Sequence, residues 1–375
     1  PPTGQGRPQA LIPKTAHQYG VSSPGLSRIR SLVGIQEIGL ILVVLLLGAV
    51  LTAFGGKVRM VEFRPNAAGE NERAIVEKNK FLNARNLTQL AKDTSFIAIM
   101  AVGATFVIIA GGIDLSVGAT YALASVLSAL VFSKGEDQVL AGVLVCLGAA
   151  TLCGLLNGGM IVLLKVHPFI ITLGTMAIYR GIAFVVTQGQ SVGGFPEPFR
   201  NFVRQEFSGG LSLVPLVVMV LVAVVGGIYL SRLAAGRRIY AVGGNELASR
   251  FSGIHVDRVK LSVFVISGLT AGIAALLALG YYGSASSGDG QGYELNVIAA
   301  AVVGGASLSG GKGSALGALL GALIIQMIST GIVILNIDQN YSQIIIGAVV
   351  ILAVLFDQLN NWLAKRRLAA RAVNP

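Results

Sequence analysis

One ionisable residue stands alone within a long apolar stretch of this 375-residue chain. The stretch runs from Thr94 to Ser133, and Asp114 is its one charged side chain. Because a carboxylate is costly to expose to lipid, such a residue faces protein or water and marks a candidate functional position. Two interpretations stay open. Asp114 hydrogen-bonds a hydroxyl-rich solute or the backbone around a cavity, or it caps a helix at a break in the stretch.

Other polar side chains interrupt apolar runs elsewhere in the sequence. Hydroxyl, amide and carboxyl groups suit the hydroxyls of a sugar, although each alone also suits a hydrogen bond between packed helices. Together they form a tentative path for a polar solute, with the members Asp114, Asn157, Thr172, Thr175, Tyr179, Glu294 and Asn296. Arg180 has three open roles: it reaches the membrane surface, pairs with Asp114 or lines the path.

The sequence contains no motif for nucleotide, metal or catalytic chemistry. It lacks a G-x-x-x-x-G-K-[ST] phosphate loop, so any nucleotide chemistry would have to come from another chain. His17, His167 and His255 lie in separate segments, and no HExxH or paired-cysteine motif occurs. Cys146 and Cys153 are about 10.5 Å apart along one predicted helix, beyond disulfide reach, which indicates plain packing. We expect no metal site, no bound cofactor and no catalytic residue.

Membrane-spanning helices must position these side chains. Hydrophobic residues make up 54% of the chain and charged residues 12%, whereas soluble domains carry about 25% charged residues. We therefore predict an all-α, polytopic membrane bundle of about ten transmembrane helices, with broken or re-entrant segments. The net charge of +11 would suggest nucleic acid in a soluble chain. Here the cations lie in loops beside spans, where they orient the chain and contact anionic lipid.

The run around Asp114 shows why some helices must break. As one helix its 40 residues would be about 60 Å long, twice the thickness of the hydrocarbon layer. We expect the break at residues 111–118 (GGIDLSVG), where glycines loosen the helix and Asp or Ser can cap a new one from Leu115 onward. Residues 304–311 (GGASLSGG) echo this segment. The echo reflects either a repeated half with a broken helix or chance among glycine-rich helices.

Charge also divides the chain into regions. Residues 1–32 are predicted to be a disordered cytoplasmic tail, 33–360 the membrane domain and 361–375 a basic cytoplasmic tail. Residues 57–93 form a long mixed-charge segment after the first span, and its role stays open. With both termini inside and that segment set aside, cytoplasmic segments hold 16 basic residues and outside segments hold 3.

A polar loop at 232–260 joins two apolar runs and holds six basic residues against two acids. This excess of positive charge places the loop in the cytoplasm. We predict a short helix from Asn245 to Phe251 within it, with Asn245 as N-cap and Glu246 in the first turn.

Four motifs in chain order resemble one protein family. They are GGIDLSVGA (111–119), HPFIITLGTMAIYRG (167–181), GRRIYAVGGNELASRFSGIHVDRVK (236–260) and YELNVIAAAVVGGASLSGGKGS (293–314). They resemble the permease subunit of bacterial ribose- or xylose-type monosaccharide ABC importers, over roughly residues 83–357. The proline-rich start and the mixed-charge segment depart from the family pattern.

The resemblance implies a non-catalytic subunit in the bacterial cytoplasmic (inner) membrane. It would pair with a second permease, identical or related, receive its monosaccharide from a periplasmic sugar-binding protein, and be driven by a cytoplasmic ABC ATPase that binds ATP and Mg. The solute path above would be the translocation path, and the loop at 232–260 would couple to the ATPase. The coupling residues it implies are Gly243, Gly244, Asn245, Glu246, Ala248, Ser249, Arg250, Ser252 and Gly253.

Alternatives stay open beside the resemblance. The same architecture could import a nucleoside or an amino acid, and the loop could be a basic linker lying on anionic lipid. An ion-coupled carrier working alone usually has several intramembrane carboxylates, whereas Asp114 is nearly solitary. No nucleic-acid partner is expected.

Overall fold

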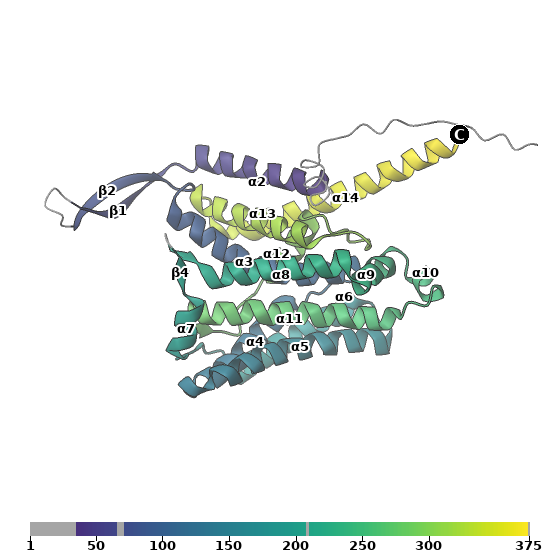
Figure 1. Cartoon of the computed structure of the whole chain (residues 1–375), viewed down its shortest axis with the longest axis horizontal. Helices are drawn as coiled ribbons and strands as arrows, with labels where there is room; N and C mark the ends of the chain where they lie inside the picture. The colour runs from purple at the N-terminus through teal and green to yellow at the C-terminus, as the bar shows by residue number, and fades with distance from the viewer. Residues whose placement is uncertain (1–34, 66–70, 208–209, 374–375) are drawn as a thin grey trace, which may run out of the picture.

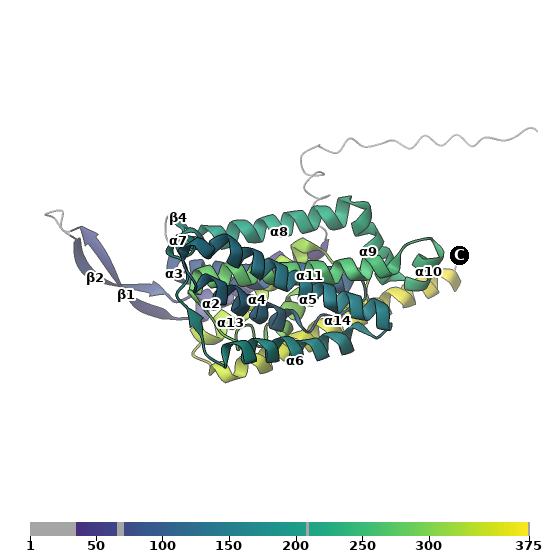
Figure 2. The same ribbon diagram turned by 90° about the horizontal axis from the view of Figure 1, so that it is seen from below.

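The described residues form ten bundle helices. They run back and forth between two distinct ends (Figures 1 and 2). The computed structural model describes residues 35–65, 71–207 and 210–373. The ten helices are α2 (Ile35–Phe54), α3 (Ala84–Ile109), α4 (Val117–Phe132), α5 (Val139–Leu164), α6 (Pro168–Thr187), α8 (Leu213–Arg232), α11 (Val256–Tyr282), α12 (Tyr293–Val303), α13 (Ala315–Ile334) and α14 (Ser342–Val373). One end carries β1 (Lys57–Pro65) and β2 (Asn71–Asn79), and we call it the hairpin end. The opposite end, which carries α10 (Glu246–Phe251), is the α10 end.

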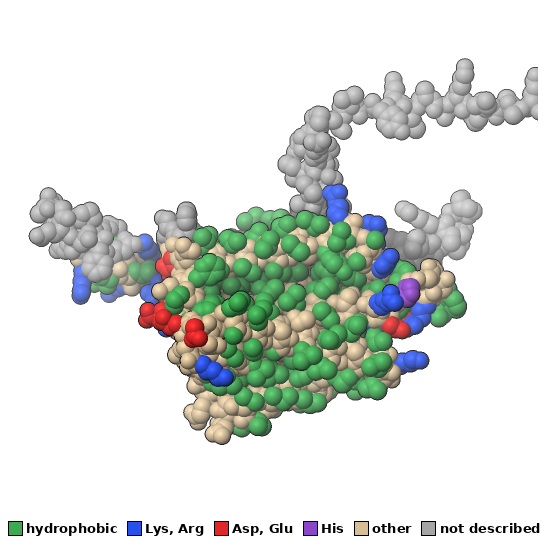
Figure 3. All heavy atoms as spheres, turned by 60° about the horizontal axis from the view of Figure 1, so that its bottom comes forward, with side chains coloured by type: hydrophobic (Ala, Val, Ile, Leu, Met, Phe, Trp, Pro, Cys, Tyr) green, Lys and Arg blue, Asp and Glu red, His purple; other side chains and the backbone are tan. Residues whose placement is uncertain are grey.

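The bundle has the dimensions and surface of a membrane protein. Within the described ranges, seven helices are long and apolar enough to cross a bilayer, and α4, α12 and the first part of α14 are shorter apolar helices. Figure 3 shows a broad hydrophobic surface on one face, with charged side chains gathered towards the two ends. The prediction of a polytopic helical membrane protein is confirmed.

α3 lies at the centre of this bundle. Of its most apolar 18-residue window 94% is buried, against 6% for α2, and it packs against α8, α11, α12 and α13. The helix begins at Ala84, ten residues before the start of the apolar run at Thr94, and the Asn83 side chain caps it by accepting from the Asn86 N–H at 2.9 Å. The end of the mixed-charge segment therefore belongs to α3. Its charged residues made this part of the helix hard to predict from the sequence.

Glycine lets neighbouring helices approach closely, because it has no side chain to hold the two backbones apart. A Cβ at Gly154 of α5 would collide with the carbonyl oxygen of Phe264 on α11. One at Gly321 of α13 would collide with the carbonyl of Ala300 on α12. Cys146 and Cys153 are free and buried within α5, in agreement with a packing role.

The hairpin end holds the strands, which the all-α prediction omitted. β1 and β2 pair in antiparallel register from Lys57–Asn79 to Pro65–Asn71. Two shorter pairs join β3 (Val192–Gly193) to β6 (Ser284–Ala285) and β4 (Glu206–Phe207) to β5 (Leu211–Ser212). α7 (Glu197–Val203) lies at the same end (Figure 1). Strands of two residues are too short to show an alternation of polar and apolar residues in a sequence. In the hairpin, consecutive charged residues obscure this alternation.

Helices extend beyond the regions assigned from charge. The tail predicted at 1–32 lies outside the described residues. α14 continues to Val373 and so crosses the expected boundary at 361 without a break. The loop at 232–260 contains α9 (Ala234–Gly244) as well as the expected α10, and two 3₁₀ turns lie at Glu136–Gln138 and Gln339–Tyr341.

Candidate functional site

The first helix break separates α3 from α4 and contains Asp114. Gly111 adopts a left-handed conformation with φ of +83°, which glycine permits without strain. The Asp114 Oδ1 atom accepts hydrogen bonds from the Ser116 N–H at 3.0 Å and the Ser116 hydroxyl at 2.7 Å. α4 begins at Val117, two residues later than expected, and its N-cap Ser116 makes no side-chain capping bond. Asp114 thus shapes the turn that precedes α4.

Side chains from three other helices converge on this break. The hydroxyl of Ser267 on α11 donates to Asp114 Oδ2 at 2.7 Å. The amide of Asn157 on α5 donates to the Ser116 hydroxyl at 2.7 Å, and the hydroxyl of Tyr179 on α6 donates to Asn157 Oδ1 at 3.0 Å. All five residues are buried. We call them the polar cluster, and it joins α4, α5, α6 and α11.

The cluster contains three of the seven residues of the tentative translocation path. Its members Asp114, Asn157 and Tyr179 were predicted as path residues, and Ser116 was considered only as a helix cap. Ser267 was missed, because a single serine in an apolar run gives no distinctive signal. The two predicted threonines lie beside it on α6. The hydroxyl of Thr172 donates to the carbonyl of Ile113 at 3.2 Å, and that of Thr175 donates to the carbonyl of Thr172 at 3.3 Å.

The two path residues on α12 lie apart from this network. Glu294 packs against the first turn of α4, where a Cβ at Gly118 would lie 2.5 Å from Glu294 Oε2. Its Oε1 accepts from the Gly292 N–H at 3.2 Å, while Oε2 is buried without a hydrogen-bond partner among the described residues. Asn296 makes no hydrogen bond to the cluster in the described part of the chain. Their place in the path stays a prediction.

Arg180 does not pair with Asp114, which was one of its three open roles. Its Nη1 donates to the carbonyl oxygens of Ser287 at 2.9 Å and Asp289 at 2.7 Å. The guanidinium therefore ties α6 to the loop between α11 and α12.

The second break, at residues 304–314, meets the first. The Gly311 N–H donates to the carbonyl of Ile109, the last residue of α3, at 2.9 Å. The end of α9 lies against both: a Cβ at Gly243 would collide with the Ile109 oxygen and lie 2.7 Å from the Gly311 nitrogen. A Cβ at Gly310, where φ is +82°, would lie 2.6 Å from the Gly243 oxygen. We call Ile109, Gly243, Gly310 and Gly311 the glycine joint.

α10 follows the joint directly and has the predicted start. The Asn245 side chain accepts from the Ala248 N–H at 2.9 Å, which confirms the N-cap. Arg250 pairs with Glu246 at 3.2 Å and with Asp257 at 2.9 Å, and Lys260 pairs with Glu246 at 2.8 Å. The hydrogen bond from Lys260, followed by that from Arg250, holds the pKa of the Glu246 carboxyl below its ordinary value. The charges of this segment thus pair largely with one another.

The outer face of α10 is apolar. The predicted coupling residues did not include the side chains of this face. Leu247 and Phe251 lie four residues apart, and so on one side of the helix, and are 64% and 85% exposed. An apolar pair at this spacing within a polar loop was the available signal. Of the predicted coupling residues, Gly243 and Ser249 face inward, and the exposed ones are Gly244, Asn245, Glu246, Ala248, Arg250, Ser252 and Gly253.

A cavity lies beside α10 at the same end. It measures about 480 Å³ and is lined by both charged and apolar side chains, among them Lys165, His167, Arg250 and Asp257. Exposed apolar side chains next to a concave, polar-rimmed surface are typical of a protein contact.

Comparison with known proteins decides the family. A family model described as "Branched-chain amino acid transport system / permease component" matches residues 86–354. The chain belongs to this family. It is therefore the membrane-spanning, non-catalytic component of a transport system, and it is a multi-pass membrane protein.

The permease is also similar to named transport proteins over most of their length. The D-allose transport system permease protein AlsC of Escherichia coli (strain K12) is 39% identical over 281 residues, which cover 74% of this chain and 85% of the relative. The ribose import permease protein RbsC of Bacillus subtilis (strain 168) is 41% identical, with 74% and 86% covered. The autoinducer 2 import system permease protein LsrD of Escherichia coli O9:H4 (strain HS) is 32% identical, with 76% and 90% covered. The resemblance to ribose-type import permeases is thereby confirmed. No solved structure matches the permease.

Proposed function

We propose that this permease carries a monosaccharide of the ribose or allose type from a periplasmic binding protein into the cytoplasm. The observation that carries the proposal is the extent of the match to permeases named for D-allose and ribose, which covers most of both chains. The four motifs quoted above support the same proposal, because they resemble those of monosaccharide import permeases. The path would run beside the polar cluster, whose hydroxyl and amide groups suit a hydroxyl-rich cargo.

The energy comes from a separate ATPase, which binds ATP and Mg. The phosphate loop missing from this sequence supports that division of labour. The α10 end is the cytoplasmic side of the inner membrane, and both termini lie there, in agreement with the excess of basic residues assigned to that side. A second permease, identical or related, completes the membrane part.

Leu247 and Phe251 are the anchors that enter the ATPase. Apolar side chains 64% and 85% exposed are costly in water and gain most from burial in a partner. Because Arg250 is already paired with Glu246 and Asp257, docking need not desolvate an uncompensated charge. Movement of α10 passes directly to Gly243 at the end of α9, and from there to both helix breaks by backbone contact.

The direct test is transport by the purified components. The permease, its ATPase and its binding protein are reconstituted in vesicles, and uptake of labelled ribose, allose, a nucleoside and leucine is measured with and without ATP. We expect ATP-dependent uptake of ribose or allose. Uptake of the nucleoside or leucine in their place would reassign the cargo, and sugar uptake driven by an ion gradient without ATP would overturn the mechanism.

A second test addresses the docking role of α10. The double variant Leu247→Ser, Phe251→Ser should lower the affinity for the ATPase at least about tenfold, since such anchors dominate interface energy. Arg250→Glu should also uncouple ATP hydrolysis from uptake. The matched control is Leu82→Ser, because Leu82 is 60% exposed near the hairpin end. Unchanged ATPase binding and uptake in the double variant would show that α10 is not the docking point.

A further inference from the structure

The hairpin of β1 and β2 stands away from the helices and projects along the bundle axis (Figures 1 and 2). Its two strands pair with each other in a two-stranded sheet, so each has an open edge. A two-stranded hairpin is marginally stable in water, and open edges readily accept a partner. The strands are nine residues long, which corresponds to about 30 Å at ~3.3 Å per residue. The family match begins at residue 86, so the hairpin lies outside the shared region.

One face of the hairpin carries an exposed apolar pair. Val61 and Ile75 are direct partners in the register and therefore point to the same side of the sheet. They are 59% and 73% exposed. The neighbouring pair on this face is Arg59 and Glu77, whose charged groups lie 3.5 Å apart. An apolar pair beside a charged rim has the composition of a small protein contact.

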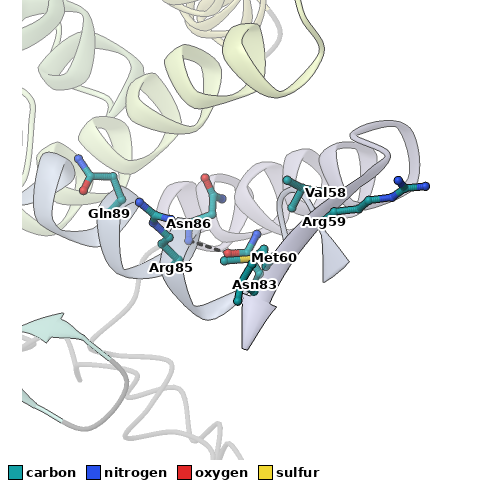
Figure 4. A pocket seen from close by; sticks show the side chains of 8 residues that line it. Val58, Arg59, Met60, Asn83, Arg85, Asn86 and Gln89 are labelled. Atoms are coloured by element: carbon teal, nitrogen blue, oxygen red, sulfur yellow. Dashed lines mark hydrogen bonds between the residues drawn. The ribbon is translucent and has the colours of Figure 1, made fainter. Parts of the chain in front are cut away.

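A cleft lies where the hairpin meets the first turns of α3 (Figure 4). Two cavities of about 680 Å³ and 480 Å³ share Met60, Asn83, Arg85 and Gln89 in their walls. We call them together the hairpin cleft. The cations that line it are Arg59, Lys78 and Arg85, and the acid that lines it is Glu206; Arg59 pairs with Glu77 of the neighbouring strand. Its charge suits an acidic partner.

We propose that the hairpin and its cleft dock an acidic face of the soluble sugar-binding protein that serves this permease. The inference rests on the proposed function, which places the hairpin end in the periplasm. Complementary charge would steer the encounter, and Val61 with Ile75 would supply apolar area once the partner is seated. A contact outside the family's shared region would distinguish the binding protein of this importer from those of its relatives.

Two other occupants fit the geometry less well. The headgroup layer of one leaflet is only about 5–8 Å thick, so most of a hairpin about 30 Å long that projects along the bundle axis lies beyond lipid. A second copy of this chain would bring the same basic cleft against itself, and like charges at an interface oppose association.

The test uses the complete importer in nanodiscs and measures ATPase stimulation by the binding protein. In the first variant, Gly-Gly replaces residues 58–78 and joins Lys57 to Asn79, which are partners in the sheet. Asn79 is kept because its amide donates to the Thr52 carbonyl at 2.7 Å and its Oδ1 accepts from the Phe81 N–H at 2.9 Å. The second variant is Lys78→Glu, Arg85→Glu. The control is Lys134→Glu, an exposed cation on the loop between α4 and α5.

Both variants should raise the half-saturating concentration of binding protein at least about tenfold, while ATP hydrolysis without binding protein and the response of the control stay within about twofold. Unchanged stimulation in both variants, with uptake intact, would overturn the docking role and leave the proposed function standing. Absence of sugar import by the wild-type importer would instead overturn the proposed function.

Crosslinking identifies the occupant directly. A photoreactive label on the variant Ile75→Cys should capture the binding protein; the natural Cys146 and Cys153 are buried and stay unlabelled. Capture of a second permease chain instead would overturn the proposal in favour of a dimer contact. Loss of the variants' defect in nanodiscs of neutral lipid would overturn it in favour of an anionic headgroup.

Discussion

The two helix breaks share a sequence pattern but are held in different ways. At the first, the Asp114 carboxylate and side chains from α5, α6 and α11 make a hydrogen-bonded cluster. At the second, glycines bring backbone against backbone, with Gly311 bonded to the end of α3 and Gly310 against Gly243. A glycine-rich motif therefore supplies only the turn, and the neighbouring helices decide whether side chains or main chain fix it. The first break should be sensitive to lost polar groups and the second to added atoms.

The largest effect is expected at the second break, from Gly243→Ala. The new methyl group would collide with the Ile109 oxygen, so α9 must move away from both breaks. Overpacking of this kind costs about 1–3 kcal/mol, and we expect uptake to fall at least about tenfold. The measurements are sugar uptake by the reconstituted importer and thermal unfolding of the purified permease.

Gly244→Ala is the matched control, because a Cβ there meets no atom within 4 Å. It makes the same chemical change one residue along the chain and should transport like the wild type. Equal uptake by the two variants would show that the joint does not transmit movement.

An intermediate effect is expected at the first break, from Asp114→Ala. Three donors, the N–H and hydroxyl of Ser116 and the hydroxyl of Ser267, would lose a buried acceptor. We expect the free energy of unfolding to fall by about 1–2 kcal/mol, and by less for Asp114→Asn, which keeps one carbonyl acceptor. Denaturant unfolding of the two variants measures the difference.

The same pair of variants separates the two roles of Asp114. Loss of uptake without loss of stability would assign the carboxylate to the translocation path instead of to the break. Full uptake with reduced stability would leave it a structural role alone. Asp137→Ala, an exposed acid on the loop between α4 and α5, controls for the loss of a charge.

The smallest effect is expected from breaking the ion pairs of α10. This experiment tests whether packing or charge keeps α10 next to the two helix breaks. Lys260 and then Arg250 lower the pKa of Glu246, so its stabilising contribution is fully present above the ordinary carboxyl pKa and is lost as the pH falls through the lowered value. The pairs are partly exposed and weak, so acid should loosen α10 only slightly. Hydrogen exchange of α10 amides at neutral and strongly acid pH measures this. Glu246→Gln should remove the acid response, and a large response that survives in it would point to another group.

Local features of this molecule were predictable from sequence. The break near Asp114 follows from 40 apolar residues that exceed a bilayer, and the Asn245 cap follows from a polar residue before a short helix. Contacts across the chain were not. The donor Ser267 is 153 residues from Asp114, and nothing in its own surroundings distinguishes it from other serines. The hairpin was missed because its second strand does not alternate: two charged residues, three apolar residues and two charged residues follow one another at 72–78. Leu247 and Phe251 were missed because the excess of basic residues dominates the composition of their loop.

The buried position of α3 has a consequence for how the protein is made. This helix has the lowest mean hydropathy of the seven long ones, 1.6, and in the finished fold almost none of its apolar window contacts lipid. Its main neighbours α11 and α13 are synthesised long afterwards. During biogenesis α3 therefore enters the bilayer before the helices that will bury it have been synthesised. A chain that stops before α11 would present an unsatisfied helix to the proteases that survey the membrane.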